Sequence, residues 1–223
     1  MTRGGCVARK ASAEDPLRCA VLISGSGTGM EKLILHQHSN PQCSHQTVIV
    51  ISDKKSVAGL SRAENLGIAN VAIELPEIED TVQRRVSHEE LITQAIEQSG
   101  AEIVILSGYM RILTAAFVER WSPNLVNIHP SLLPHFPGAD AHGDVIASTV
   151  EVSGCTVHFV DSGVDSGAII AQCRVPRFSD DDAASLGARV RVEEHRIYPL
   201  VIDAIAQGRV FKEGDLVTVD GDL

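Results

Sequence analysis

The sequence predicts an α/β domain built on a doubly wound, mostly parallel sheet. Short apolar runs that suit buried strands alternate with amphipathic helical segments along most of the chain. Glycine stands after several of these segments, where a turn is required. The 223 residues are enough for a domain with a sizeable core. Regular alternation of strand and helix indicates right-handed crossovers between parallel strands.

The first part of the chain carries this alternation most clearly. We expect strands at 18–23, 47–52, 68–73 and 102–107. We expect helices at 30–38, 57–66, 87–99 and 114–121, the third opened by a capping box at Ser87 and the fourth capped by Thr114. Ligands of doubly wound sheets bind beyond the carboxyl ends of the strands, so the loops there are expected to share one crevice.

The last part departs from that pattern. A helix at 141–150 precedes segments 154–160 and 167–175, which predict a β-hairpin, and a long helix follows at 182–207. Residues 209–223 are expected to form a short hairpin or tail. We expect 18–223 to be one domain. Residues 1–17 lack periodicity, which indicates a disordered leader or tail, with a transit peptide as the alternative.

Composition excludes several classes of protein. The formal net charge of −10 argues against broad binding to a nucleic-acid backbone, which requires a basic surface. No apolar run reaches the roughly 18 residues that a membrane span needs, so we expect a soluble protein with no membrane partner. The five cysteines are scattered and include no Cys-x-x-Cys pair, which favours a reducing compartment, the cytoplasm.

A glycine-rich loop, Ser24-Gly25-Ser26-Gly27-Thr28-Gly29, joins the first predicted strand to the first helix. At such a junction unpaired backbone N–H groups and the helix dipole attract an anion such as a phosphate monoester. The loop is not a Walker motif, and Met30 stands where a dinucleotide fingerprint needs its third glycine. A glycine turn that holds no ligand remains the alternative.

Polar residues at two other loops are candidates for chemistry. Asn127 and His129 lie two apart in an extended segment and therefore point to one face, before prolines end the strand. Asp161 and Asp165 lie in a glycine-containing loop between the hairpin segments. The alternatives are a polar strand exit for the first pair and an ordinary turn for the loop, which we favour for Asp161.

Metal and covalent catalysis have little support in the sequence. The histidines show no helical pair with a carboxylate, so we expect no metal. There is no Gly-x-Ser-x-Gly elbow and no reactive cysteine context. The candidate set is instead an amide, an imidazole and a carboxylate, which can transfer an acyl group directly between two bound molecules.

Four motifs together resemble the phosphoribosylglycinamide formyltransferase (GAR transformylase) family. They are Ile23–Gly29, Gly108–Leu113, Asn127–Pro134, and Gly154–Val160 with Asp165, in the family's order over about residues 18–212. The resemblance implies a Rossmann-like formyltransferase fold with a C-terminal hairpin and long helix. It implies that 10-formyltetrahydrofolate, as co-substrate, gives its formyl group to the amine of glycinamide ribonucleotide (GAR) in purine synthesis. Monomers or weak homodimers are the expected form.

The resemblance also implies roles for residues at the matching positions. The catalytic trio would be Asn127, His129 and Asp165, and Glu194 would bind GAR. The GAR phosphate would lie at Gly27, Thr28 and Gly29, although relatives usually carry Asn where this chain has Gly29. Folate contacts would come from Arg84, Met110, Arg111, Ile112, Leu113 and Asp161. The family also holds the peptide that matches Leu133-Pro134 in cis.

Three rival functions stay open. A formyltetrahydrofolate hydrolase would use water as the acceptor, but usually carries an N-terminal regulatory domain for which 17 residues leave no room. Methionyl-tRNA formyltransferase would need a basic tRNA-binding domain. A non-catalytic nucleotide-binding module would use Asp53 as a ribose contact, but would not explain Asn127, His129 and Asp165 together.

Overall fold

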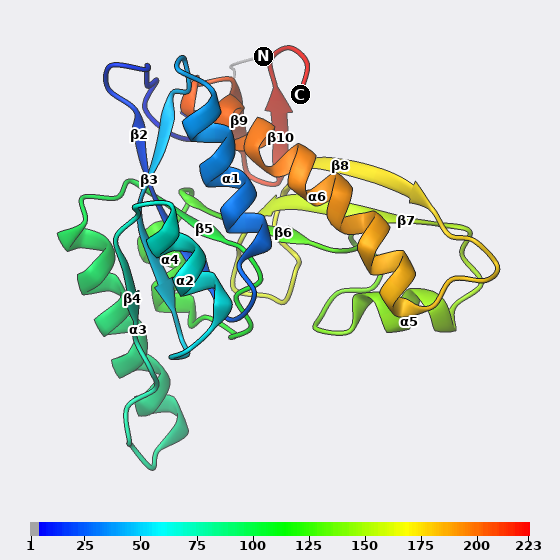
Figure 1. Cartoon of the computed structure of the whole chain (residues 1–223), viewed down its shortest axis with the longest axis horizontal. Coiled ribbons are helices and arrows are strands. Elements are labelled where there is room, and N and C mark those ends of the chain that lie inside the picture. The colour runs from blue at the N-terminus through cyan, green and yellow to red at the C-terminus, as the bar shows by residue number, and fades with distance from the viewer. Residues whose placement is uncertain (1–4) are drawn as a thin grey trace.

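A mixed sheet forms the centre of the structure, a computed structural model that describes residues 5–223 (Figure 1). Its strands are β2 (Leu17–Ile23), β3 (His45–Ser52), β4 (Asn70–Ala72), β5 (Ile103–Leu106), β6 (Leu125–His129), β7 (Val152–Phe159) and β8 (Ile169–Pro176). Their order is β4-β3-β2-β5-β6-β7-β8. The strands from β2 to β6 pair in parallel, whereas β7 pairs in antiparallel fashion with both β6 and β8. The predicted mostly parallel sheet and its hairpin are therefore confirmed.

The order of the strands places the switch point between β2 and β5. The chain moves outward from β2 to β3 and β4, then returns to the other side of β2 with β5 and β6. The glycine loop follows β2, Ser107–Arg111 follows β5, and Asn127 and His129 end β6. Because parallel strands end at the same edge, these segments meet there, as the sequence predicts.

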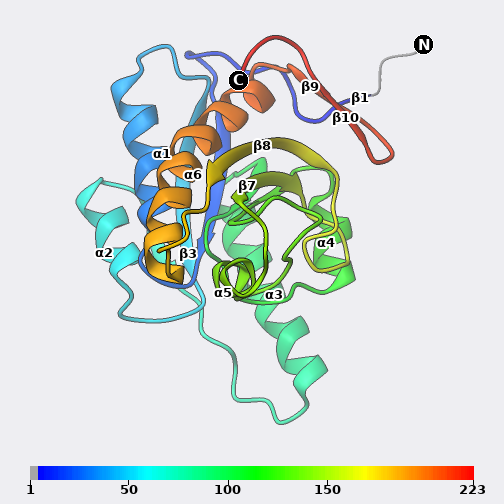
Figure 2. The ribbon, with the colours of Figure 1, turned by 90° about the vertical axis from the view of Figure 1, so that its right-hand side faces the viewer.

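Helices cover both faces of the sheet (Figures 1 and 2). They are α1 (Thr28–Ser39), α2 (Ala58–Asn65), α3 (Thr81–Gln98), α4 (Ala115–Trp121), α5 (Ala141–Ala147) and α6 (Ala183–Ala206). One core contains side chains of α1, α2, α5 and α6, and the other those of α3 and α4. Val21 enters the first core and the adjacent Leu22 the second, which explains why β2 is apolar throughout. Among the helices of residues 5–223, none combines the length and the hydropathy that a bilayer crossing demands.

The start of α3 differs from the prediction. The helix begins at Thr81 and not at Ser87, because the Asp80 side chain accepts a hydrogen bond from the Gln83 N–H at 2.7 Å and caps it. The first two turns bury no apolar residue, and Val82 is exposed, so hydrophobic periodicity gave no signal there. The predicted cap at Thr114 is confirmed, since its side chain accepts from Phe117 N–H.

The leader also differs from the prediction over residues 5–17. Strand β1 (Gly5–Cys6) joins β9 (Val210–Glu213) and β10 (Leu216–Val219) in a small antiparallel sheet. Val7 and Ala11 are buried, and Arg9 Nε lies 2.6 Å from Glu102 Oε1. These contacts order a segment that we expected to be disordered, while residues 1–4 lie outside the described residues. The expected C-terminal hairpin is formed by β9 and β10.

Candidate active site

A pocket of about 540 Å³ opens at the carboxyl ends of β2, β5 and β6. Most of the sequence-predicted site residues line it: Gly27, Thr28, Gly29, Met110, Arg111, Ile112, Leu113, Asn127, His129, Asp161, Asp165 and Glu194. Arg84 does not line this pocket. It lines a second depression of about 360 Å³ that shares the wall Tyr109–Leu113 with the first.

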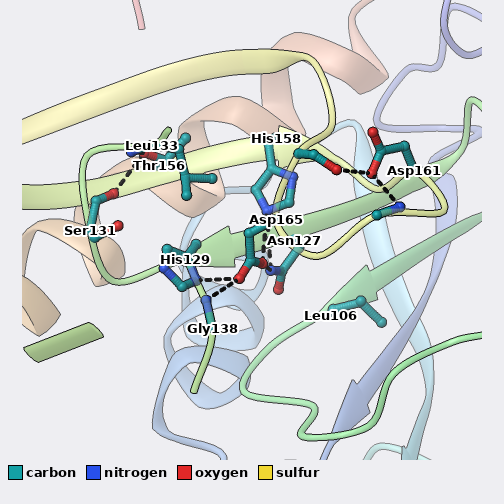
Figure 3. A network of polar contacts seen from close by, with 12 residues as sticks. Leu106, Asn127, His129, Ser131, Leu133, Gly138, Thr156, His158, Asp161 and Asp165 are labelled. Atoms are coloured by element: carbon teal, nitrogen blue, oxygen red, sulfur yellow. Dashed lines mark hydrogen bonds and ion pairs between the residues drawn. The ribbon is translucent and has the colours of Figure 1, made fainter. Parts of the chain in front are cut away.

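Asp165 and His129 form the centre of the site (Figure 3). His129 Nδ1 lies 3.2 Å from Asp165 Oδ2, and the Gly138 N–H donates to the same oxygen at 2.9 Å. Asp165 has a φ of 51°, a left-handed conformation that a non-glycine residue adopts only when its surroundings hold it there. The contact with His129 and the hydrogen bond from the Gly138 N–H together hold the Asp165 carboxylate against the imidazole.

Both ring nitrogens of His129 face oxygen atoms. Nε2 lies 2.8 Å from the carbonyl oxygen of Phe136, which can only accept a hydrogen bond, and Nδ1 faces the Asp165 carboxylate. A neutral ring has a single N–H and leaves one of these oxygens facing a lone pair. The doubly protonated imidazolium satisfies both. The ring is thereby held between the Phe136 carbonyl oxygen and the Asp165 carboxylate.

His158 orients the Asn127 amide. Its Nδ1 donates to the Phe159 carbonyl oxygen at 2.8 Å, so its Nε2 accepts from Asn127 Nδ2 at 3.2 Å. Burial lowers the pKa of His158, which favours this neutral form. The second amide hydrogen is directed at Asp165 Oδ1, a long contact of 3.5 Å. This long contact is the one that an incoming carbonyl oxygen can replace most easily.

No role was expected for His158 from the sequence, although it lies in the motif Gly154–Val160. Its position on β7 is directly opposite Asn127 on β6. Two residues of opposed strands lie within reach of each other, so the pairing of β6 with β7 brings them together. The register of β6 against β7 is what identifies His158 as the partner of Asn127, and it cannot be read from the sequence alone.

Hydrogen bonds to β7 and β8 hold the proline-rich loop beside His129. Thr156 Oγ1 donates to the Ser131 carbonyl oxygen at 2.7 Å and accepts from the Leu133 N–H at 3.0 Å. Gln172 Nε2 donates to the Leu133 carbonyl oxygen at 2.8 Å. The Leu133-Pro134 peptide is cis, as the resemblance implied. The buried backbone of this loop is therefore satisfied by side chains of the neighbouring strands.

The glycine loop presents the N-terminus of α1 to the same pocket. Gly27, the N-cap, has a φ of 69°, and within the described residues no side chain caps the helix. The Glu31 N–H donates to the Gly27 carbonyl oxygen, so the N–H groups before it belong to the open first turn. A Cβ on Gly27 would lie 2.6 Å from Gly59 Cα, so this close approach requires glycine. The geometry suits an anion.

Helix α6 contributes Arg191, Glu194 and His195 to the pocket wall. Burial raises the pKa of Glu194 to about 7, although the Arg191 charge opposes the shift. One turn further, the Tyr198 hydroxyl lies 2.8 Å from the Leu106 carbonyl oxygen and 3.2 Å from that of Val126. Tyr198 thus ties α6 to the ends of β5 and β6, which holds Glu194 at a fixed distance from the sheet.

The segment after β5 forms an apolar wall. Met110 and Ile112 are exposed to the extent of 60% and 63%, which is unusual for large apolar side chains and typical of a ligand surface. Arg111 Nε lies 2.7 Å from Asp53 Oδ2, so this wall is tied to the loop after β3. Asp53 is thereby engaged by a protein cation.

Asp161 closes its own loop. Its Oδ1 accepts from the Gly163 N–H at 3.0 Å and from the Ser166 hydroxyl at 2.8 Å. The interpretation of Asp161 as a turn residue is therefore confirmed, and the residue also lines the pocket. The turn fixes the segment that carries Asp165.

The comparisons with known proteins agree with this geometry. A family model described as formyl transferase matches residues 17–202. The chain is 36% identical to the phosphoribosylglycinamide formyltransferase of Escherichia coli, over 92% of this chain and 94% of that one. It superimposes with a TM-score of 0.86 and 36% identity on glycinamide ribonucleotide transformylase 1 from Symbiobacterium toebii, covering 92% of this chain and 94% of the other.

A longer relative matches through one part only. The chain is 43% identical to the human trifunctional purine biosynthetic protein adenosine-3, over 86% of this chain but only 19% of that protein. The chain thus spans about a fifth of the length of that relative. Since the family model covers more than half of the sequence, and the Escherichia coli relative is matched over almost its whole length, the chain belongs to the formyl transferase family.

Proposed function

We propose that the chain transfers the formyl group of 10-formyltetrahydrofolate to the amine of GAR, giving formyl-GAR and tetrahydrofolate. The observation that carries the proposal is the convergence of Asn127, His129 and Asp165 on the pocket that also receives the N-terminus of α1. One pocket then offers donors for a reacting carbonyl and a site for a phosphate. The Escherichia coli relative is named for the same reaction.

The Asn127 amide and the His129 imidazolium stabilise the charge that develops. When the GAR amine attacks the formyl carbon, negative charge forms on the formyl oxygen. Both donors are engaged within the protein, at 3.5 Å to Asp165 Oδ1 for the amide and at 2.8 Å to Phe136 O for the ring, so each exchanges a protein acceptor for the formyl oxygen. Such a donor is worth about 3 to 4 kcal/mol in the transition state.

Asp165 moves the proton. The attacking amine becomes positively charged and must lose a proton, while the folate nitrogen must gain one as the carbon–nitrogen bond to folate breaks. A carboxylate held 3.2 Å from His129 Nδ1 can accept the first proton and return it, directly or through a water. Atoms and charge balance with no external acid or base. Positioning of the two substrates supplies much of the remaining rate.

The substrates are placed by opposite walls. We assign the GAR phosphate to the backbone of Gly27–Gly29, and Glu194 to the GAR sugar or amine. Folate lies between the apolar wall, Met110–Leu113, and the loop of Asp161. Arg84 faces the neighbouring depression, where it would meet the acidic tail of folate and not its ring. Backbone donors at Gly29 remain despite the missing asparagine side chain.

The wider setting is proposed from the same observations. We propose one formyltransferase domain over residues 18–223, against which residues 5–17 pack, acting in the cytoplasm as a monomer or weak homodimer. The transfer chemistry requires no metal, nucleic acid or membrane. The rival binding module loses support because Asp53, its ribose contact, is paired with Arg111.

A coupled assay tests the proposal. The protein is mixed with 10-formyltetrahydrofolate, with and without GAR, and tetrahydrofolate release is followed together with formyl-GAR formation. The proposal expects release only with GAR, in a ratio of one formyl-GAR to one tetrahydrofolate. Release without GAR would assign the hydrolase function. Absence of release under both conditions would assign the binding module.

A further inference from the structure

A second cluster of polar side chains lies at the opposite end of the sheet from the pocket. His36 near the end of α1, Cys43 in the following loop, His45 at the start of β3 and Asp203 on α6 each offer one donor atom, and these atoms lie within 4.8 Å of one another. Strand β3 begins there, so this is the amino end of the parallel strands. The catalytic groups have no contact with this cluster.

The distances approach those of a metal centre. His36 Nε2 lies 2.7 Å from Asp203 Oδ2, His45 Nε2 lies 3.0 Å from Asp203 Oδ1, and Cys43 Sγ lies 3.7 Å from the same oxygen. Ligands at about 2.0–2.3 Å from a tetrahedral zinc ion lie roughly 3.3–3.8 Å from each other. Side-chain rotations that move these donor atoms by about 1 Å are therefore enough for them to surround a zinc ion.

Burial leaves two of these donors, on His45 and Cys43, with poor partners. His45 is 2% exposed, and its Nε2 makes no hydrogen bond of acceptable geometry although Asp203 Oδ1 is near. Cys43 and Asp203 are each 9% exposed, and the thiol makes only weak contacts, with Asp203 and with the His45 carbonyl oxygen. A buried polar atom without a good partner is costly, so it indicates a ligand that the protein groups share.

We propose that His36, Cys43, His45 and Asp203 form a structural zinc site. A thiolate, two imidazoles and a carboxylate are ligands that zinc accepts, whereas magnesium and calcium prefer oxygen alone. Thiolate and carboxylate together neutralise the two positive charges of the ion, so the buried complex has no net charge. Four protein ligands close the site, as in structural rather than catalytic centres. The ion would join α1, β3 and α6.

Gln37 sets the tautomer of His45, and its present contact opposes zinc binding. Its Oε1 accepts from the Thr47 N–H at 3.0 Å, and its Nε2 lies 2.9 Å from His45 Nδ1. That contact puts the ring proton on Nε2, the atom that must face zinc. Binding therefore requires the proton to move to Nδ1 and the amide to turn. Gln37→Glu offers an oxygen to both Nδ1–H and Thr47 N–H, so it should tighten zinc binding about tenfold.

The test uses the full chain stripped of metal with a chelator and titrated with zinc chloride and, separately, cobalt chloride. One zinc ion per chain should bind and raise the melting temperature, because it binds the folded state alone. Cobalt should give the intense visible bands of a tetrahedral site and a thiolate charge-transfer band. Absence of saturable one-to-one binding in the wild-type chain would overturn the proposal.

Matched variants locate the ion. Cys43→Ser should abolish the thiolate band and weaken zinc binding at least about 100-fold, while Cys6→Ser, at an exposed cysteine, should leave both unchanged. His36→Asn should weaken binding similarly, and His38→Asn, two residues along the same helix at an exposed position, should not. Equal affinity in Cys43→Ser and wild type would show that zinc binds elsewhere and would contradict the assignment.

Discussion

Two histidine–aspartate clusters lie at opposite ends of one sheet, and they differ in what surrounds them. The pair of His129 and Asp165 opens on a pocket of about 540 Å³, and Asp165 is held in a left-handed conformation. The cluster around Asp203 is enclosed by α1, β3 and α6, and its aspartate lies on a regular helix. The same chemical groups thus lie beside an open pocket at one end and among packed elements at the other, where we propose that they serve reactivity and stability respectively.

The sharpest difference should appear in Asp165→Asn. Asparagine tolerates the φ of 51° and can still accept from the Gly138 N–H, so folding should persist. The variant loses the charge beside His129 and the proton acceptor, so kcat should fall at least about 1000-fold. Steady-state turnover and urea unfolding measure the two quantities. Turnover near that of wild type would remove Asp165 from the mechanism.

Asn127→Ala should have the next largest effect. Losing one oxyanion donor should lower kcat about 100-fold to 1000-fold, with a smaller change in KM. His158→Ala is the companion variant, because it removes only the acceptor that orients the amide at 3.2 Å. We expect its loss in kcat to be smaller. A larger loss for His158→Ala would mean that His158 itself contacts the reacting atoms.

Asp203→Asn tests the enclosed cluster. The variant removes the carboxylate charge that faces His36 at 2.7 Å and His45 at 3.0 Å, so the free energy of unfolding should fall by about 3 kcal/mol. Its main loss should be in stability, the reverse of Asp165→Asn. Denaturant unfolding at matched zinc concentration measures it. A variant as stable as wild type would contradict a stabilising role for this end of the sheet.

Glu194 should make stability depend on pH. Its pKa is raised from 4.5 to about 7 by burial, so the folded chain holds this proton over a range in which the unfolded chain has lost it. Stability contributed by the neutral form is present below pH 4.5 and is lost as pH rises to about 7. Relative to wild type, Glu194→Gln should gain up to about 3 kcal/mol across that window. A difference independent of pH would contradict the burial argument.

Gly27→Ala should give the smallest effect of the five. The added Cβ meets backbone at 2.6 Å and the φ of 69° is strained for alanine, so the loop must shift and the KM for GAR should rise about tenfold. Gly67→Ala is the control, because Gly67 has a φ of 73° but open space around its Cβ. An equal rise of the KM for GAR in both variants would mean that backbone strain, and not damage to the phosphate site, causes the effect.

Much of the fold was accessible from the sequence because its signals are local. Apolar runs, glycine stops and the cap at Thr114 located most strands and helices. Strand ends gathered the glycine loop, Ser107–Arg111, and Asn127 with His129, whereas the family resemblance added Asp165. The start of α3 was not predicted because Asp80 caps a first stretch of helix that buries no apolar residue. The ordered structure of residues 5–17 was not predicted because it depends on contacts with β9 and Glu102, which are distant in the sequence.

Side-chain partnerships were the least predictable part of the site. His158 acts on Asn127 through the register of β6 and β7, which one sequence does not state. His36, Cys43 and His45 lie close together in the sequence, but Asp203 joins them only because α6 packs beside α1. The expectation of no metal rested on local spacing alone, and the zinc proposal departs from it.

We expect His129 and Asp165 to act as one unit in formyl transfer, and a double-variant cycle would show it. Single-turnover formyl transfer would be measured at saturating GAR for His129→Gln, Asp165→Asn and the double variant. When two groups act as a unit, removing either one already removes their joint effect. The double variant should therefore react within about tenfold of the slower single variant. If the two losses instead multiply in the double variant, the residues act independently and the proposed mechanism is contradicted.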